Sequence, residues 1–424
     1  MTTAQIGSDL EQDLQKVFGG DSGALRQFRV RAWQAYQTLP PHRFERSDLA
    51  GKLPAFAPQS ARVAGDWRSV VAPYVDLDGD QPLLVLADGE PVYAQGLDAL
   101  PDGVTTRPLR EAAQEESVVR LLGSVVPVEE NQWTALQSAF FQNGAYVHFS
   151  KNATFDGVIQ VVHVTLTGGR GAFPRNLIVA DEGSRLTVLE LYLAPEGLLP
   201  DAHFGVTEVV ARPGSQVDLG VVANLPKKTT SYTVRRALVE RDARVDFTVG
   251  EFGDGYCVSE FGARLQGAGS ASNARAVVLG SGRAHMDLTA KMVHEGVFSQ
   301  SDTSARGVMQ GRAEGVYRGI THIQKGASGA VGEQAERLLM LSPKSRADAI
   351  PMLLIDENDV KCGHAASVGQ ISEEQLFYLM SRGISEAAAK RMIVWGFLDP
   401  VLATLPASRV RQAVVEILER KMNG

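Results

Sequence analysis

Several features are scarce in this 424-residue sequence, and each absence excludes a class of site or partner. The only cysteines are Cys257 and Cys362, which excludes a disulfide framework and any Cys-x-x-Cys zinc or cluster box held by this chain alone. No stretch reaches the roughly 20 apolar residues that a membrane-spanning helix needs. The net charge of −7 argues against a broad basic face for nucleic acid and against a polybasic membrane anchor. We therefore expect no nucleic-acid partner and no membrane partner.

Catalytic motifs are also missing. The sequence has no Gly-x-x-x-x-Gly-Lys-Ser/Thr phosphate loop, so we expect that this chain binds and hydrolyses no ATP, and it has no Gly-x-Ser-x-Gly elbow. His294-Glu295 begins like a zinc-protease motif, but Phe298 stands where that motif needs histidine. His163 and His322 lie in strand-like sequence, where an inward-facing imidazole is more often a bonded core group than a metal ligand.

The composition that remains is that of a folded protein. Apolar residues make up 44% and charged residues 21% of the sequence, as in globular proteins. The length suggests two or three domains. The first residues, Met1 to Glu11, are polar and acidic, unlike a secretory or organellar targeting segment. We expect a cytoplasmic protein with two free thiols.

Helices are predicted near the N-terminus. Apolar residues recur at the spacing of one helix face over residues 9–18 and again over residues 25–39, where two prolines follow. Residues 42–110 mix short apolar runs, such as residues 82–87, with turn residues. This mixture predicts an N-terminal domain that is mainly helical and contains some strand.

Strands and turns dominate the middle of the chain. After a predicted helix at residues 131–144, short apolar runs alternate with Gly, Asp, Asn and Ser up to residue 355. One theme recurs there: a turn is followed by apolar residues on alternate positions. Its copies are residues 182–189, 213–219, 242–249, 281–288 and 310–317.

The spacing of these copies indicates the fold. The leading apolar residues Leu186, Val217 and Val245 are 31 and 28 residues apart. Met286 and Val316 are 30 residues apart. Such a period, without helices between the strands, favours a β-solenoid, in which each coil buries its inner face on the next. An antiparallel β-sandwich shows the same alternation and is the alternative.

The tail returns to helix. Ser372 begins a helix with capping-box spacing, and Gly383 is placed to end it in a left-handed conformation. Ser385 caps a second helix that Pro400 stops, and a last helix runs through residues 410–418. These helices form either a self-contained cap or a docking platform for another protein. We therefore predict a mainly β protein with helical ends and three domains, at residues 1–120, 121–355 and 356–424.

Cys362 and His364 are the candidate metal ligands. They lie one residue apart in what reads as a polar turn between the last strand and the first tail helix. If the backbone is extended there, both side chains project to the same side, so a thiolate and an imidazole could bind one soft metal. Two ligands do not close an iron or zinc site, so another chain would supply the rest. The alternative is a buried structural cysteine beside a polar turn histidine.

A longer string around these residues resembles a known family. Asp-Val-Lys-Cys-Gly-His-Ala-Ala-Ser-Val-Gly at residues 359–369, with Glu-Gln-Leu-Phe-Tyr-Leu-Met-Ser-Arg-Gly-Ile at residues 374–384, resembles the C-terminal signature of the SufB/SufD family of iron–sulfur assembly proteins. The Cys-x-His string is similar to the SufD type, since SufB-type chains carry Glu-His-Glu-Ala in its place. Three further stretches follow the family's order: residues 100–104, 133–144 and 338–351.

The resemblance implies a fold and a role. The fold is a mainly helical N-terminal domain, a right-handed parallel β-helix and a C-terminal helical domain. The role is that of a non-catalytic scaffold subunit that pairs with a SufB paralogue and shares a nascent, transient iron–sulfur cluster with it. The SufC ATPase is implied as the partner that hydrolyses ATP. A homodimer is the alternative state of the isolated chain.

The resemblance also assigns residues. It implies that His364 lies at the interface with SufB and belongs to an iron or cluster site that SufB completes, with Cys362 as the weaker ligand. Gly363 and Ala365 replace the usual serine and glycine, which moves the flexible position to the other side of His364.

The tail helices are implied to dock the ATPase, through Phe377, Tyr378, Arg382 and Gly383. Two alternatives remain. One is a purely structural subunit that stabilises SufB and recruits the ATPase, with no cluster ligand of its own. The other is a solenoid enzyme acting on polysaccharide, which would need a cluster of carboxylates along one face that the sequence lacks.

Overall fold

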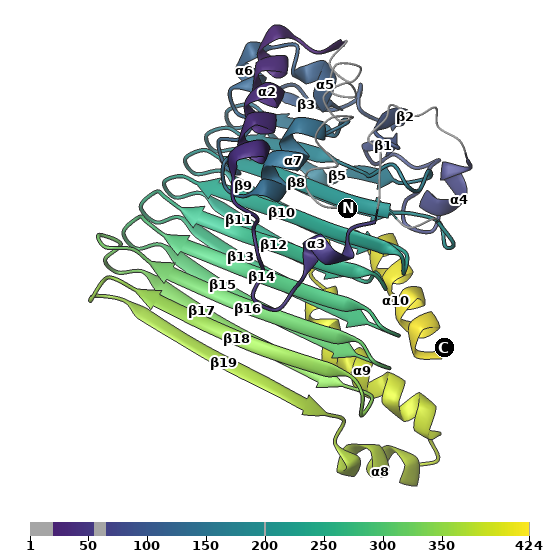
Figure 1. Ribbon diagram of the computed structural model, residues 1–424. Coiled ribbons are helices and arrows are strands. Elements are labelled where there is room, and N and C mark those ends of the chain that lie inside the picture. Colours follow the sequence, from purple (N-terminus) through teal and green to yellow (C-terminus); the bar gives the residue numbers. More distant parts are fainter. Residues whose placement is uncertain (1–19, 55–64, 199–200, 424) are drawn as a thin grey trace.

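Two long β-sheets form the walls of a flattened solenoid of about 8 turns, with helices at both ends (Figure 1). The computed structural model describes residues 20–54, 65–198 and 201–423. The helix predicted at residues 9–18 lies outside the described residues. Strands make up 43% of the structure, which confirms the mainly β prediction.

One sheet has ten strands, in the order β19-β17-β15-β13-β11-β9-β7-β5-β1-β2, and the other has nine, in the order β18-β16-β14-β12-β10-β8-β6-β4-β3. The ten-stranded sheet consists of β19 (Lys361–Gln370), β17 (Val331–Met340), β15 (Gln300–Met309), β13 (Ala271–Gly280), β11 (Arg244–Glu251), β9 (Gln216–Asn224), β7 (Arg185–Leu193), β5 (Thr154–Val164), β1 (Leu83–Ala87) and β2 (Glu90–Gln95). The nine-stranded sheet consists of β18 (Arg346–Ile355), β16 (Glu314–Ile323), β14 (His285–His294), β12 (Tyr256–Leu265), β10 (Thr229–Val239), β8 (Asp201–Ala211), β6 (Arg175–Ala180), β4 (Ala145–Phe149) and β3 (Val104–Pro108). The strands therefore span residues 83–370, beyond both ends of the range 121–355 expected for the β-core.

Parallel pairing between successive coils confirms the solenoid, and the antiparallel sandwich is wrong. Leu186, Val217 and Val245 stand in register on β7, β9 and β11, as the repeat predicted. The later spacing needs correction, because Met286 pairs with Gly315 and not with Val316. The coil there is one residue shorter than the residue pattern suggested. These later copies run into β14 and β16 of the nine-stranded sheet, whereas the first three run into β7, β9 and β11 of the ten-stranded sheet, so the theme occurs on both walls.

Side chains that alternate along the strands fill the space between the walls. Large and small inward residues alternate along the solenoid: Phe247 of β11 is fully buried, and Met286 and Leu288 of β14 are 1% exposed. The small residues include Ala274, Ala276, Ala290 and Ala305, which are all buried. Each coil thus buries its inner face on its neighbours, which is the main source of stability in such a fold.

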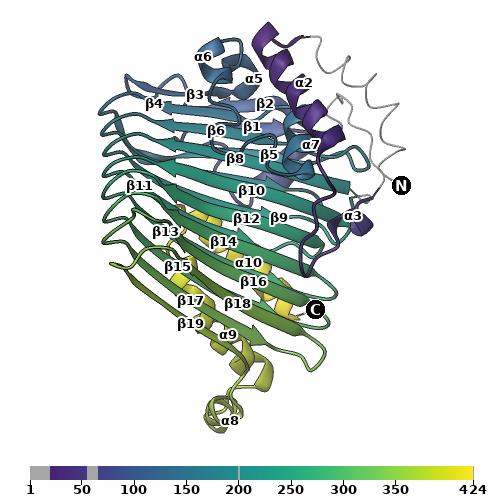
Figure 2. The ribbon, with the colours of Figure 1, turned by 60° about the vertical axis from the view of Figure 1, so that its left-hand side comes forward.

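The described helices are α2 (Gly23–Thr38), α3 (Leu49–Lys52), α4 (Trp67–Val71), α5 (Leu109–Ala112), α6 (Glu116–Val119), α7 (Gln132–Phe140), α8 (Glu373–Ser381), α9 (Glu386–Leu402) and α10 (Ser408–Asn423). Helices α2 and α7 confirm the predictions at residues 25–39 and 131–144. Both pack on the outer face of the nine-stranded sheet near its N-terminal end (Figure 2). Aromatic side chains make this contact, including Trp133 of α7 stacked on Phe204 of β8.

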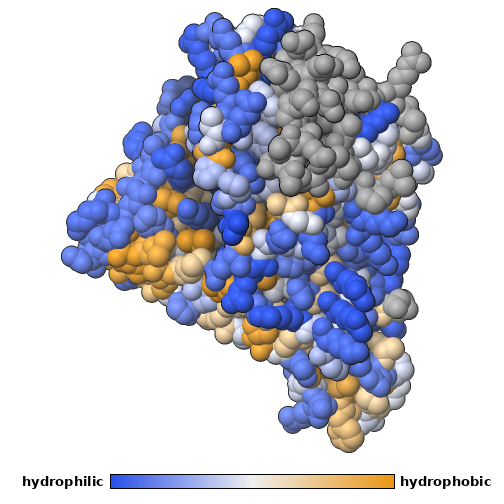
Figure 3. Space-filling view, in the orientation of Figure 1, coloured by the Kyte–Doolittle hydropathy of each residue, from blue (hydrophilic) through white to orange (hydrophobic). Residues whose placement is uncertain are grey.

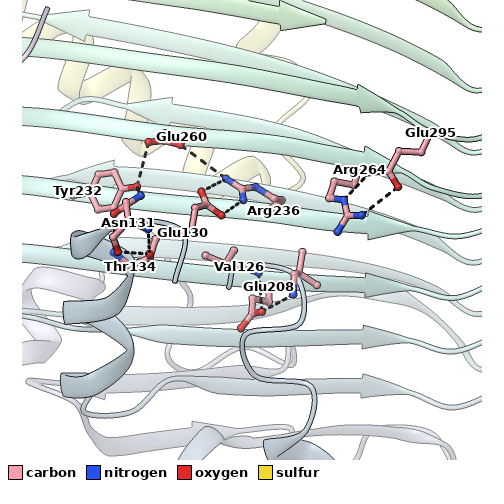
Figure 4. Close-up of polar contacts among 11 residues, drawn as sticks. Val126, Glu130, Asn131, Thr134, Glu208, Tyr232, Arg236, Glu260, Arg264 and Glu295 are labelled. Atoms are coloured by element: carbon pink, nitrogen blue, oxygen red, sulfur yellow. Dashed lines mark hydrogen bonds and ion pairs between the residues drawn. The ribbon is translucent and has the colours of Figure 1, made fainter. Parts of the chain in front are cut away.

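The segment before α7 is tied to the same outer face by polar contacts (Figure 4). The carboxylate of Glu208 accepts the backbone N–H of Val126 at 3.0 Å and forms a buried ion pair with Arg175 at 2.5 Å. Glu130 binds Arg236 of β10. These bonds hold the segment before α7 over the first coils of the solenoid.

Helices α9 and α10 lie on the outer face of the ten-stranded sheet, where buried side chains such as Val394 and Val414 meet residues of β7 to β15. The prediction that Pro400 ends α9 is wrong, because the helix continues to Leu402. Val401 and Leu402 are buried against the sheet, and this burial stabilises the last turn despite the missing N–H of proline. Arg306 of β15 donates to the carbonyl of Phe397 at 2.5 Å, which further anchors α9.

Candidate functional site

Cys362 and His364 lie in β19, the last strand of the solenoid. The prediction that they lie in a polar turn is wrong. The turn precedes the strand, and residues 361–370 pair with β17 in a parallel ladder. The free edge of β17 supplies this pairing. The strand itself is rich in Gly, Ala and Ser, so its alternation is too weak to be recognised in the sequence.

Both side chains face the interior side of the solenoid, as expected for positions i and i+2 of an extended backbone. Cys362 stands in register with Gly332, and His364 stands in register with Gln334, which is 3% exposed. No further coil follows β19 in the described chain. His364 faces the interior side, but no described coil covers it from the C-terminal side, so its side chain is exposed.

The two candidate ligands have different surroundings. Cys362 is half-buried and packs beside the apolar cluster of Ile323, Ala327 and Ala330. Burial, with the nearby Glu333 carboxylate as the second cause, raises the pKa of the Cys362 thiol, so the free thiol keeps its proton at neutral pH. His364 is the more accessible donor. The packing of Cys362 agrees with the alternative of a structural cysteine as well as with a weaker ligand.

The described residues contain no group of three or more His, Cys, Asp or Glu placed to hold a metal ion. The structure thus brings together the two predicted donors and leaves their ligand set incomplete. Of the other histidines, His163 is buried and bonded to Asn176 at 3.1 Å, which confirms its reading as a core group. His322 is directed outward and bonds Asp356 at 3.0 Å.

The solenoid ends at two edge strands. In the described chain β18 pairs only with β16, and β19 only with β17, so each presents a row of unpaired backbone groups. Apolar side chains are exposed beside these edges: Leu354 is 48%, Ile355 43% and Val368 41% exposed. Figure 3 shows apolar surface toward this end of the solenoid and again over α8. We call β18 and β19 with these three side chains the free end.

The implied docking residues lie on α8, which follows β19 directly. Phe377 is 74% exposed and Tyr378 57% exposed, and the guanidinium of Arg382 lies 5.1 Å from the Tyr378 ring. Gly383 ends α8 with φ of 86°, which confirms the predicted left-handed position. Ser372 and Ser385 cap α8 and α9 as predicted.

A groove of about 670 Å³ separates α8 from α9. Phe377 and Tyr378 line one side of it, and Met392 and Ile393 of α9 line the other. We call this the α8–α9 groove. Exposed aromatic and methionine side chains around a groove are typical of a protein interface.

Two residues near the Cys-x-His string were missed by the reasoning from sequence. Gln334 and Glu336 of β17 face the interior one coil below His364, and they are 3% and 1% exposed. Burial raises the pKa of Glu336 to about 7. Gln334 and Glu336 are two residues apart, so the sequence predicts that they share one face of a strand. The sequence does not show whether that face of β17 is the inner or the outer one.

Comparisons with known proteins point to the same family as the Cys-x-His string. A family model described as the SufBD core domain of SUF system FeS cluster assembly matches residues 163–397. The iron-sulfur cluster assembly protein SufD of Bacillus subtilis is 36% identical over 364 residues, which are 84% of this chain and 83% of that protein. SufBD family proteins of Staphylococcus epidermidis and Staphylococcus aureus are 30% identical over 302 and 292 residues, and the chain spans 64% and 63% of their lengths.

Among the described helices, none is both long and apolar enough to cross a membrane. The family model covers more than half of the chain, and it includes the solenoid coils from β6 to β19 that carry the candidate site. The chain belongs to the SufB/SufD family of iron–sulfur cluster assembly proteins, with a SufD-type Cys-x-His string on its last strand.

Proposed function

We propose that the chain is a non-catalytic scaffold subunit that pairs with a SufB-type chain through the free end and holds iron or a nascent cluster at a shared site. The observation that carries this proposal is His364, an exposed imidazole on an edge strand with an incomplete ligand set. A second chain that pairs with β18 and β19 would cover the exposed apolar side chains and bring its own donors to His364.

The chemistry of a shared site suits a scaffold. A neutral imidazole and a thiolate are good donors for iron. One or two donors from each chain leave the cluster labile, so it can be passed on. His364 is the first donor to meet the iron, because it is exposed and Cys362 must first lose the proton that its surroundings retain.

The α8–α9 groove is proposed to receive the SufC-type ATPase. Only two residues separate β19 from α8, so a displacement of α8 by the ATPase would be transmitted to the strand that carries His364. ATP hydrolysis would then take place in the partner.

The test is His364→Ala in the complex co-produced with the SufB-type and ATPase partners. We expect the complex to assemble normally and anaerobic iron and sulfide incorporation to fall about tenfold or more, because a ligand is lost. His322→Ala is the matched control, since it removes an imidazole from the outer face of the neighbouring wall. Unchanged cluster formation in His364→Ala would favour the purely structural subunit, a function with which the packing of Cys362 also agrees.

A further inference from the structure

Unpaired oxygen atoms gather inside the solenoid one coil below His364. Among the described residues, neither carboxylate oxygen of Glu336 has a hydrogen-bond partner, and neither do Oε1 of Gln334 and the hydroxyl of Tyr317. These side chains are 1%, 3% and 2% exposed. Buried polar atoms in folded proteins are nearly always bonded, so this cluster requires an explanation.

A second glutamate in the same interior column is fully bonded, in contrast to Glu336. Glu190 faces inward on β7, at the covered end of the column that ends with Glu336 and Ala366. It is fully buried, and it accepts bonds from Asn176 at 2.9 Å, Tyr192 at 2.8 Å and Thr207 at 2.9 Å. The solenoid thus satisfies one buried carboxylate completely and surrounds the other with no donor in bonding range among the described residues.

Two of the unpaired oxygens, Oε1 of Glu336 and Oε1 of Gln334, converge on one space. Gly319 of β16 faces them from the opposite wall, and a Cβ atom placed on it would lie 2.2 Å from Oε1 of Glu336 and 3.2 Å from Oε1 of Gln334. The missing side chain of Gly319 therefore provides the room into which both oxygens project. Tyr317 lies two residues earlier on the same face of β16.

The orientation of the Gln334 amide follows from its bonds. Its nitrogen donates to the carbonyl of Met352 at 3.3 Å and to Oγ1 of Thr321 at 2.7 Å. A backbone carbonyl only accepts, so the nitrogen is on that side and Oε1 is on the side of Glu336. The cluster consequently presents three acceptor oxygens and one hydroxyl.

We propose that Glu336, Gln334 and Tyr317 form an oxygen-donor site for a divalent cation, which is ferrous iron if the proposed function holds. A carboxylate with amide and hydroxyl oxygens is a suitable donor set for Fe²⁺ and Mn²⁺. The site lies one strand below His364, about 5 Å along the solenoid. In the last coil only the small Ala366 stands in register with Glu336, so the cation reaches the site from the free end.

The test uses the metal-free full-length chain with Mn²⁺ as the probe, followed by the loss of the electron paramagnetic resonance signal of the free ion. We expect one Mn²⁺ per chain and an affinity at least about tenfold lower in Glu336→Gln. Glu333→Gln is the matched control, because Glu333 is an exposed glutamate on the outer side of the same strand. Thermal unfolding of each variant checks that it is folded.

Two results overturn the proposal. One is the absence of Mn²⁺ binding that depends on Glu336. The other is an infrared band of a protonated carboxyl that disappears in Glu336→Gln but does not respond to Mn²⁺, which would show that the site holds a proton. His364→Ala separates this inference from the proposed function, because it should keep Mn²⁺ binding while cluster formation falls.

Discussion

At the N-terminal end of the solenoid, each sheet is completed by a short antiparallel strand, whereas at the C-terminal end β18 and β19 are ten residues long and have one described neighbour each. The edge strand β2 carries Pro91, and its pairing with β1 contains a register shift. A proline and an irregular edge both prevent pairing with another chain. Helices and aromatic side chains also cover this end.

The free end lacks most of these protections. Pro351 is the one proline in the two edge strands, and both strands carry exposed apolar side chains. One end of the solenoid is therefore closed by its own chain, and the other is left available. This difference supports the proposal that a SufB-type chain pairs with the end that carries Cys362 and His364.

The largest expected effect concerns packing at the N-terminal end of the solenoid, which we call the covered end. Phe204 is fully buried between Phe173 and Trp133, so Phe204→Ala should lower the free energy of unfolding by roughly 3–5 kcal/mol. Urea unfolding followed by circular dichroism measures this loss. Val368→Ala at the free end is the control, and it should change stability by less than about 0.5 kcal/mol. Equal losses in the two variants would remove the distinction between the ends.

The next effect concerns the interior near the free end. Burial raises the pKa of Glu336 from 4.5 to about 7, so the folded chain holds a proton that the unfolded chain has released between these pH values. Stability should therefore fall as the pH rises from 4.5 to 7, by about 3 kcal/mol from this group.

Glu336→Gln isolates this contribution. Its unfolding free energy, measured with a chelator present, should exceed that of the natural chain by an amount that grows up to pH 7 and then stays constant. A difference that does not vary with pH would show that Glu336 is bonded or hydrated in the folded chain.

A smaller effect is expected at the α8–α9 groove. Phe377→Ala should weaken binding of the SufC-type ATPase by about 2 kcal/mol, because an exposed aromatic that lines a groove is a typical interface anchor. Calorimetric titration measures the affinity. Phe298→Ala is the matched control, since Phe298 is a 66% exposed phenylalanine between β14 and β15. Equal affinities for both variants would argue against docking in this groove.

The smallest effect on stability is expected for charges at exposed apolar positions. Leu354→Lys should change the unfolding free energy by less than about 0.5 kcal/mol, yet it should reduce pairing with the SufB-type chain because the charge would be buried in the interface. Light scattering during gel filtration measures the pairing. Val30→Lys, at a 42% exposed position on α2, should leave pairing intact. Loss of pairing in Val30→Lys instead would place the interface at the covered end.

The local features of this protein were predictable from its sequence. The caps at Ser372 and Ser385 and the helix end at Gly383 depend on residues within one turn of helix. The alternation that indicated a solenoid depends on residues two apart. Such short-range rules apply wherever the segment lies, so Leu186, Val217 and Val245 could be aligned before their contacts were known.

Tertiary structure alone decided the register between coils. Pairing across about thirty residues places Gln334 beside His364 and Glu336 beside Ala366, and neither local propensity nor alternation specifies these neighbours. The same pairing turns an apparent loop around Cys362 and His364 into a strand, because the free edge of β17 provides the hydrogen bonds that a Gly- and Ala-rich segment cannot provide by itself. The candidate ligands were therefore visible in the sequence, but their position on an open edge and the polar cluster below them were not.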